Sequence, residues 1–487
     1  MGGKGGGKPN KIPRRPEVSR AIVESSDEWV TREEDGARLV KPYTFTYLVN
    51  VKERWEGKSV AEVFENEFRG RDIEYYRSAC RTGRITLCGK TVDPDDRRVL
   101  RQCQWLTHLI HRHEPAVIEI PKLKVLRSSD QLVAVVKPAG LPCHPVGQFR
   151  KNTVLGVVHG QLGMPDACAI HRLDRPVSGV LFIARNTEIA NFFRIVMQEK
   201  TSIRKSYVAR VTGNFPKHTC ALHSSEAQEE TNFFVNGEIA PEFFDPPGPN
   251  EETEGEKQEC TCWMYCNEPL EYDLRAGVGC ISKGGPLAKE CSTRFRLLKS
   301  LPGKDESLVV CEPLTGRSHQ IRLHLQAIGF PISNDPLYGP GITREEALLA
   351  AQPPLPTYEI PQGKKHEKVR GAPGMTTEED DESFKPPSDS SGWTEEDLRR
   401  VRCVHCPHIS SPRQGYKVGN DWSDDLDILF LHSYRYQVDF QGCSDDILSR
   451  VESVLDTPGS KLLTISAPVP SEWSDLEFQP YTAPSGD

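Results

Sequence analysis

The sequence predicts a folded protein that contains both short strands and helices, with long polar segments between them. Three observations support this prediction. Apolar and polar side chains alternate at the strand period over 41–56, capping residues begin several amphipathic segments, and 27% of the 487 residues are charged while 37% are hydrophobic. That composition is typical of a soluble chain with substantial disordered segments beside its folded domains.

Composition and charge narrow the class of protein. No stretch approaches the roughly 18 apolar residues of a membrane-spanning helix, so we expect no membrane partner, and residues 1–8 lack the apolar centre of a secretory signal. The 15 cysteines are odd in number and scattered, which indicates free thiols in a reducing compartment. The net charge of −8 does not argue against a nucleic-acid partner, because acidic runs at 251–259 and 378–382 lie in stretches that we expect to be disordered.

The N-terminal part is predicted to contain a disordered basic tail, residues 1–40, and a small domain, residues 41–117. Ser59 followed three residues later by Glu62 is the pattern of a capping box, and Gly83 supplies a helix stop. The predicted elements are a strand over 43–51, helices over 59–68 and 73–80, and a hairpin over 85–92.

This order of helix, helix, basic turn and hairpin resembles the α-L (S4-like) RNA-binding domain of ribosomal proteins and RNA modifiers. The resemblance implies that Arg77, Arg81 and Arg84 cluster where the second helix meets the hairpin and contact an RNA backbone. The alternative is a small structural cap with solvated arginines.

A larger domain is predicted over 118–342 together with 402–470, followed by a C-terminal tail, 471–487. Two segments interrupt it: an insertion at 217–287, partly disordered, and a disordered acidic and proline-rich insertion at 343–401. The predicted strands and helices are 124–126, 132–136, 153–158, 187–199, 205–211, 291–298, 307–311 and 462–465, and the stretch 426–436 is apolar enough to pack back on the core.

Cysteine and histidine spacing does not indicate a metal site. Cys260, Cys262 and Cys266 form a Cys-x-Cys-x3-Cys pattern, and Cys403, His405 and Cys406 have no second pair nearby. Neither pattern is a usual zinc spacing, so we expect no metal.

One nine-residue stretch, His171–Gly179, carries the densest chemistry. Asp174 lies between two arginines, and apolar runs on both sides predict a loop between two buried strands. An arginine neighbour keeps a carboxylate ionised and oriented, so Asp174 is either half of a structural ion pair or a reacting nucleophile or base. From these residues alone, the structural ion pair is the favoured reading.

A second dense stretch, 313–340, predicts a helix that Thr315 or Ser318 caps, that runs to about Ala327, and that Gly329 ends. Arginine in a first turn opposes the helix dipole, so the two arginines of this stretch, Arg317 and Arg322, require an anion beside them. No phosphate-binding loop, nucleophile elbow or dinucleotide fingerprint is present in the sequence.

The stretch His171–Gly179 resembles the signature of the RluA-type family of RNA pseudouridine synthases. Segments 137–141, 205–209, 316–324 and 331–338 match the other motifs of that family in the same order, and the flanking regions are similar to its eukaryotic cytoplasmic branch. The resemblance implies an α+β fold, with a mixed, mostly antiparallel sheet, flanking helices and a cleft across the middle. It also implies that the protein converts uridine in RNA to pseudouridine.

The resemblance assigns roles to individual residues. Asp174 is the expected catalytic aspartate, Tyr207 stacks on the flipped base, Arg322 (or Arg317) pairs with Asp174, and Arg172 fills the gap that the base leaves. The remaining expected substrate contacts are His171, Arg175, Arg317, His319, Gln320 and Lys137. No cofactor is implied, because the isomerisation is redox-neutral.

The implied partner is RNA, with tRNA first and rRNA or mRNA as alternatives, and we expect a monomer in the cytoplasm, with the nucleus as an alternative and mitochondria left open. Two other functions are kept: an RNA-binding or RNA-folding protein with minor or lost catalysis, and a hydrolase of other substrates with an aspartyl nucleophile. The first would be favoured by binding without modification, and the second by turnover without RNA.

Overall fold

The computed structural model describes residues 43–216 and 263–351 with short gaps, residues 428–473 with several gaps, and the short pieces 22, 29–31, 37–41, 234–235 and 238–239. Among the described helices, none combines the length and the apolar character that crossing a bilayer requires.

The helices are α1 Val60–Glu67, α2 Ile73–Arg81, α3 Val154–Leu162, α4 Thr187–Val196, α5 Gln320–Ala327 and α6 Arg344–Ala351. The strands are β1 Trp29–Thr31, β2 Ala37–Val40, β3 Tyr43–Asn50, β4 Ile85–Leu87, β5 Lys90–Thr91, β6 Trp105–Arg112, β7 Val117–Ile118, β8 Val125–Ser128, β9 Leu132–Lys137, β10 Cys168–Ala169, β11 Ser178–Ala184, β12 Ile203–Thr212, β13 Phe234–Val235, β14 Glu238–Ile239, β15 Met264–Cys266, β16 Leu270–Asp273, β17 Val278–Ile281, β18 Thr293–Leu301, β19 Glu306–Pro313, β20 Leu431–Asp439 and β21 Leu462–Ser466.

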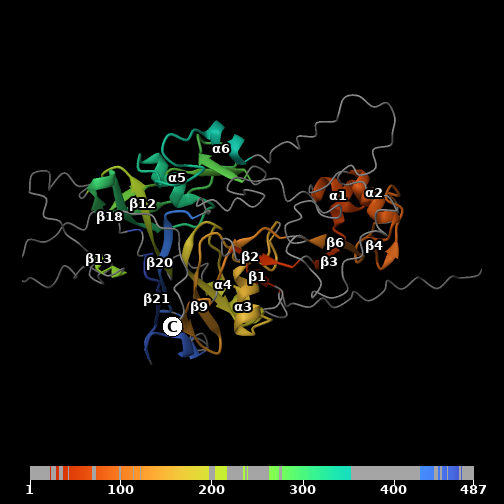
Figure 1. The fold of residues 1–487 in the computed structure, drawn as a ribbon, viewed down its shortest axis with the longest axis horizontal. Coiled ribbons are helices and arrows are strands. Elements are labelled where there is room, and N and C mark those ends of the chain that lie inside the picture. Colours follow the sequence, from red (N-terminus) through yellow and green to blue (C-terminus); the bar gives the residue numbers. More distant parts are fainter. Residues whose placement is uncertain are drawn as a thin grey trace, which may run out of the picture.

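One large sheet organises the described core (Figure 1). Its ten strands follow the order β15-β18-β19-β12-β20-β11-β9-β8, with β10 beside β11 and β21 beside β20. All of these pairs are antiparallel except β11 with β20, which are parallel. The predicted α+β fold with a mixed, mostly antiparallel sheet is confirmed.

The two central strands come from distant parts of the chain. Every residue of β11 is buried, as the continuous apolar run after the signature loop predicts for a strand covered on both faces. Strand β20 lies between β11 and β12, so the C-terminal segment is part of the core. Trp473 is also buried, against Phe430 and His432, which corrects the predicted tail at 471–487 for this residue.

Apolar side chains form a separate core on each face of this sheet. One core contains α3 residues such as Val157 and also Ile22, while the other contains α4 residues such as Phe193. Strands β1, β2 and β7 form a three-stranded sheet, and Trp29 packs against the α3 core. The prediction of a disordered tail over 1–40 is therefore wrong for the described residues 29–31 and 37–40.

The small N-terminal unit has its own core, around Trp55, Tyr75 and Leu106. Its strands follow the order β3-β6-β4-β5, with α1 and α2 packed against each other; Figure 1 shows them to one side of the large sheet. The predicted helices and hairpin are confirmed, as are the Ser59 capping box and the positive φ of Gly83, 75°. Buried Glu114 connects this unit to the larger domain by accepting hydrogen bonds from the backbone N–H groups of residues 150–152.

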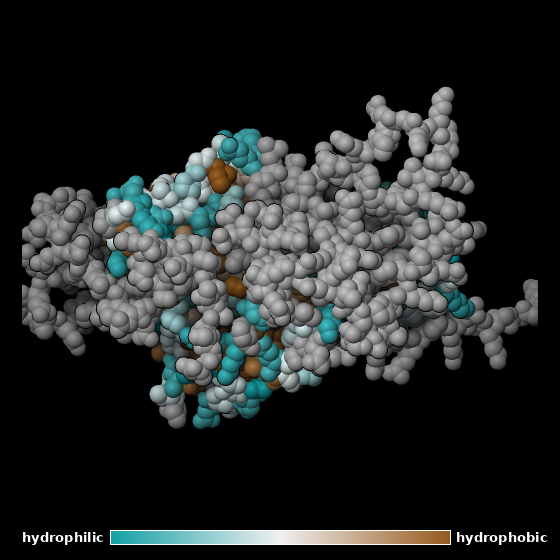
Figure 2. All heavy atoms as spheres, viewed as in Figure 1, coloured by the Kyte–Doolittle hydropathy of each residue, from teal (hydrophilic) through white to brown (hydrophobic). Residues whose placement is uncertain are grey.

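The predicted insertion at 217–287 contributes to the folded core. Strand β15 extends the large sheet by pairing with β18, and the hairpin β16–β17 packs on α5. The prediction of an insertion is therefore wrong for the described residues 263–273 and 277–287. In Figure 2, the described surface that is visible is mostly hydrophilic, with hydrophobic residues scattered in small spots, as is usual for a soluble protein.

Candidate active site

Asp174 lies in the loop between β10 and β11, as the sequence predicts, and its side chain is 28% exposed. The loop leads directly into β11, where Gly179 has a φ of 115° and lies against the backbone of Ser433 in β20. A Cβ at position 179 would lie 2.2 Å from the Ser433 carbonyl oxygen, so only glycine permits this contact. The parallel pairing of β11 with β20 therefore fixes where the loop ends.

Lys137 holds the same loop by hydrogen bonds to its backbone carbonyl groups. Its ammonium is fully buried and donates to the carbonyl oxygens of Pro138 (2.8 Å), Arg175 (2.9 Å) and Val177 (2.6 Å). Burial lowers the pKa of Lys137 to about 8. Because all three donors are used within the protein, Lys137 clamps the catalytic loop, which corrects its predicted role as a substrate contact.

His171 belongs to the floor of the site. Its ring stacks on Tyr436, with centroids 4.6 Å apart, and its Nε2 accepts the Phe182 backbone N–H at 3.2 Å. Its Nδ1 lies 3.3 Å from the Tyr436 hydroxyl. Burial, and then the nearby Lys205, lower the pKa of His171 to about 3, so the ring is neutral. With both nitrogens engaged inside the protein, His171 is not the substrate contact that we expected.

Tyr207 lies on β12 and is buried beside the same floor. Its hydroxyl is 3.5 Å from the hydroxyl of Tyr436. Burial raises the pKa of Tyr207, and the charge of Asp174 contributes to the rise. Tyr207 is therefore a neutral phenol within electrostatic reach of Asp174, which is the neighbourhood expected for it.

Helix α5 starts at Gln320, one residue later than a Ser318 cap requires and four residues later than a Thr315 cap requires. His319 occupies the N-cap with a left-handed backbone, φ 56°, and makes no side-chain cap hydrogen bond. Gln320 explains this start, because its Oε1 accepts from the Thr315 hydroxyl and the Arg317 N–H while its Nε2 donates to the Ser292 carbonyl and the Thr293 hydroxyl. Gln320 thus has no free donor for RNA, contrary to its predicted role.

Arg322 is the buried arginine of the site, but its direct partner is Asp335. Its Nε and one terminal nitrogen donate to the two Asp335 oxygens, each at 2.6 Å. Burial alone would lower the pKa of Arg322 and raise that of Asp335, but their mutual attraction outweighs burial and shifts both pKa values in the opposite directions. The predicted Asp174–Arg322 ion pair is therefore wrong. Arg322 affects Asp174 only at longer range, since Asp174 contributes to the raised pKa of Arg322.

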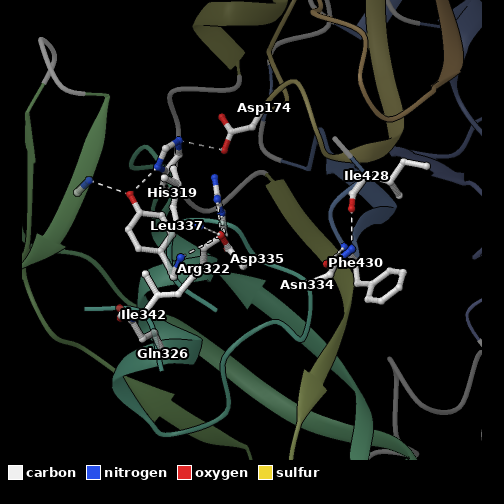
Figure 3. A network of polar contacts seen from close by, with 12 residues as sticks. Asp174, His319, Arg322, Gln326, Asn334, Asp335, Leu337, Ile342, Ile428 and Phe430 are labelled. Carbon is white, nitrogen blue, oxygen red and sulfur yellow. Dashed lines mark hydrogen bonds and ion pairs between the residues drawn. The ribbon is translucent and has the colours of Figure 1, made fainter. Parts of the chain in front are cut away.

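Among the described residues, the side chain that faces the Asp174 carboxylate is His319. Its Nε2 lies 3.8 Å from Asp174 Oδ2, a contact that Figure 3 shows, and its Nδ1 lies 2.8 Å from the Tyr338 hydroxyl. The imidazole therefore contacts the carboxylate with one nitrogen and the phenol with the other. Burial, and then Arg322, lower the pKa of His319 to about 4. His319 was expected to contact substrate, whereas its ring faces Asp174 directly.

Three arginines surround this centre. Arg172 is exposed, and no hydrogen bond or ion pair joins its side chain to a residue that the structure describes. Arg175 is half-buried, with its guanidinium 5.7 Å from the Phe149 ring centroid. Arg317 donates to the Glu290 carbonyl, so it is not the partner of Asp174 either.

The arginines of the N-terminal unit have different environments. Arg77 forms ion pairs with Glu74 and Asp95, and Arg84 donates to Thr82 and lies over the Tyr75 ring. Arg81 is exposed. Two of the three predicted RNA contacts are thus occupied by protein partners, and only Arg81 is presented as expected.

Three residues of the site were missed as site residues: Asp335, Tyr338 and Tyr436. Asp335 and Tyr338 lie in the segment 331–338 that matched a family motif, which was the available signal. Tyr436 lies in the apolar stretch 426–436, where nothing in the sequence distinguishes a site residue from a core residue. Within the described residues no cluster of metal ligands occurs, and the Cys403–Cys406 group lies outside them.

The site therefore combines one partly exposed carboxylate, a neutral imidazole, a buried arginine–carboxylate pair, a buried tyrosine and an exposed arginine. These groups would allow the carboxylate to act as a nucleophile or a base on a substrate that stacks against the tyrosine. Comparison with known proteins gives the class. Residues 131–327 match the family model described as RNA pseudouridylate synthase.

The chain is 32% identical over 413 residues to RNA pseudouridine synthase 7 of Oryza sativa, covering 82% of this chain and 87% of the relative. It therefore belongs to the RNA pseudouridylate synthase family. It is also 35% identical to the mitochondrial tRNA pseudouridine(32) synthase of Saccharomyces cerevisiae, covering 62% of this chain and 54% of that protein. The solved structure of human RNA Pseudouridylate Synthase Domain Containing 4 is 15% identical, covers 72% of this chain and 90% of that one, and has a TM-score of 0.35.

Proposed function

We propose that this protein isomerises uridines in RNA to pseudouridine and that Asp174 is its catalytic carboxylate. The observation that carries the proposal is the placement of Asp174 in a loop that Lys137 and Gly179 fix, beside His319 and within electrostatic reach of Tyr207 and Arg322. The reaction breaks the bond from ribose C1′ to uracil N1 and forms one from C1′ to C5. N1 gains a proton and C5 loses one, so no oxidant or cofactor is needed.

The chemistry of the surrounding residues supports this role. Asp335 neutralises most of the charge of Arg322, and His319 is neutral, so no full cation locks Asp174 into an ion pair. A carboxylate that is oriented but not neutralised remains nucleophilic or basic. Tyr207 offers a buried aromatic face for an extruded base, and exposed Arg172 is free to fill the vacated stack. Arg322 is proposed as the residue that stabilises negative charge at Asp174 from longer range.

The substrate class that we propose is tRNA, with rRNA or mRNA as alternatives. Two yeast relatives have names that specify tRNA pseudouridine synthases, for positions 32 and 31. The N-terminal unit is proposed to be an α-L-like RNA-binding domain, with Arg81 as its exposed cation. We propose that the protein acts as a monomer in the cytoplasm; one relative is named as mitochondrial, so cell fractionation that finds the protein in mitochondria or nuclei would overturn the location.

The decisive experiment uses RNA carrying tritium at uracil C5, because C5 loses its hydrogen when the new bond forms. Asp174→Asn is compared with a control variant, Asp166→Asn. Asp166 is an exposed carboxylate that precedes the signature loop in the sequence. We expect tritium release from tRNA by the wild type and the control, and none above background by Asp174→Asn. Release by Asp174→Asn at the wild-type rate would refute the assignment.

The same proteins separate catalysis from binding. If the wild type binds tRNA tightly and releases no tritium from any RNA pool, the alternative function, an RNA-binding or RNA-folding protein, replaces the proposal. If Asp174→Asn keeps RNA affinity and loses release, Asp174 acts in the chemical step.

A further inference from the structure

A chain of three polar contacts leads from the hairpin β16–β17 to Asp174. The Gly279 backbone N–H donates to the Tyr338 hydroxyl at 2.8 Å, this hydroxyl lies 2.8 Å from His319 Nδ1, and His319 Nε2 lies 3.8 Å from Asp174 Oδ2. Figure 3 shows the last of these contacts, between His319 and Asp174. Each contact joins segments that are far apart in the sequence.

The direction of the protons along this chain follows from the donors and acceptors. Burial raises the pKa of Tyr338, so its hydroxyl keeps its proton. Because the Gly279 N–H already donates to that oxygen, the Tyr338 proton is directed to His319 Nδ1, which must then accept. A neutral imidazole that accepts at Nδ1 carries its hydrogen on Nε2, the nitrogen that faces Asp174.

We propose that His319 is a positioning residue for Asp174, presenting an Nε2–H to its carboxylate in a tautomer that Tyr338 and Gly279 fix. The proposal rests on the proposed function, because it concerns the orientation of the same carboxylate. At 3.8 Å the contact is too long for a hydrogen bond in the unliganded protein. We expect it to shorten when RNA occupies the site, as catalytic hydrogen bonds commonly do.

The surroundings of His319 support positioning over simple packing. Its ring is held edge-to-face by Tyr272 (5.2 Å) and by Tyr338 (5.5 Å), which leaves it little rotational freedom. Its left-handed backbone is a conformation that a non-glycine residue adopts at a cost, and such strain is concentrated at functional sites. The charged groups that affect it are Arg322, Asp174, Asp335 and Arg172, and the Arg322–Asp335 pair is largely self-compensated.

Substitutions that imitate one ring nitrogen test the tautomer. In His319→Gln the side-chain amide reaches the position of Nε2, whereas in His319→Asn it reaches that of Nδ1. We expect His319→Gln to keep kcat within about tenfold of the wild type, and His319→Asn and His319→Ala to lose about 10²-fold in kcat with little change in KM, the loss typical of a misplaced reacting group. His144→Gln is the folding and activity control, at a half-buried histidine whose Nδ1 lies 3.1 Å from the Pro145 carbonyl oxygen.

A spectroscopic measurement on the full chain gives a second, activity-independent readout. Histidine ring 15N shifts, assigned by loss of one signal in His319→Gln, should show His319 neutral at pH 7 with its proton on Nε2. Tyr338→Phe should shift the His319 signals toward a mixture of tautomers and lower kcat. Tyr338→Phe with unchanged 15N shifts, or His319→Asn as active as His319→Gln, would overturn the proposal.

The outcomes also separate this inference from the proposed function. If the wild type releases tritium and Asp174→Asn does not, but His319→Ala is as active as the wild type, only the positioning role fails. If the wild type releases no tritium from any RNA, the function fails, and the 15N shifts still decide whether the tautomer was assigned correctly.

Discussion

Replacing Lys137 by Met distinguishes two possible roles of this lysine. It either clamps the signature loop or contacts RNA phosphates. The structure places its ammonium in full burial with three carbonyl oxygens as acceptors, two of them in the signature loop at Arg175 and Val177. Met has similar length and no charge, so Lys137→Met removes the donors and little volume. We expect loss of loop order and therefore of kcat, together with loss of stability.

The size of the stability loss follows from two opposing terms. Three buried carbonyls that lose their donor cost about 1–3 kcal/mol each, or about 6 kcal/mol together at the middle of that range. Removing the buried ammonium relieves a desolvation cost: a pKa lowered from 10.5 to about 8 corresponds to about 3 kcal/mol. The net destabilisation expected for Lys137→Met is therefore about 3 kcal/mol.

Urea unfolding at pH 7 measures the stability, and tritium release at several salt concentrations measures kcat and KM. Lys124, an exposed lysine just before β8, supplies the control variant Lys124→Met, for which we expect a change below about 0.5 kcal/mol. A Lys137→Met protein as stable as the wild type, with a raised KM and a smaller salt dependence of binding, would show that Lys137 contacts RNA phosphates and would refute the clamp.

Other predictions concern the backbone, the RNA contact and the response to acid. Gly179→Ala should prevent soluble folding, because its Cβ would meet the Ser433 carbonyl oxygen at 2.2 Å, whereas Gly140→Ala, at φ 78° with open space, should cost only about 1–2 kcal/mol in denaturant unfolding. Arg172→Ala should lower kcat/KM and reduce the slope of log binding constant against log salt by about 0.7–0.9 if Arg172 meets one phosphate, as fluorescence titrations can measure. The pKa of His319, about 4, lies below the unfolded value of 6.5, so its stabilising contribution is complete above pH 6.5 and falls as pH drops toward 4. We expect about 2 kcal/mol of stability from His319 at pH 7 to be absent at pH 5, and this part of the pH dependence should vanish in His319→Gln.

Local signals predicted the local structure well. Ser59 and Glu62 form the expected capping box, and Gly83 adopts the expected positive φ. These features depend on residues within one helical turn, so they can be recognised without tertiary information. The continuous apolar run after the signature loop likewise predicted the fully buried strand β11.

The pairing of Arg322 could not be predicted in the same way. The sequence argument that an arginine near the start of α5 requires an anion was correct, but it did not say which carboxylate supplies it. Asp174 and Asp335 were both available, and the choice depends on a turn in which Asp335 also accepts the N–H groups of Leu337 and Tyr338. That turn aims both oxygens of Asp335 at the guanidinium, a geometry that spacing along the chain does not reveal.

Polar residues inside a functional motif were too readily interpreted as substrate contacts. Lys137, His171 and Gln320 all lie in motif segments, yet each has its polar atoms engaged by the protein itself. A site that holds a loop carboxylate in place needs buried donors behind it, and such donors have the same residue types as groups that bind RNA. Burial, which separates the two roles, appears only in three dimensions.

The distribution of charge explains why so much of the site is scaffold. If Arg322 paired directly with Asp174, the carboxylate would be held by a full positive charge and would be a weak nucleophile. Asp335 removes that charge from the contact, while neutral His319 can orient Asp174 by a dipole alone. A fixed dipole guides a carboxylate at a smaller cost in reactivity than an ion pair does, because only the ion pair must be broken when a new bond to the substrate forms. We therefore propose that the buried pair and the Tyr338–His319 chain are two parts of one arrangement, which orients Asp174 and leaves it available to the substrate.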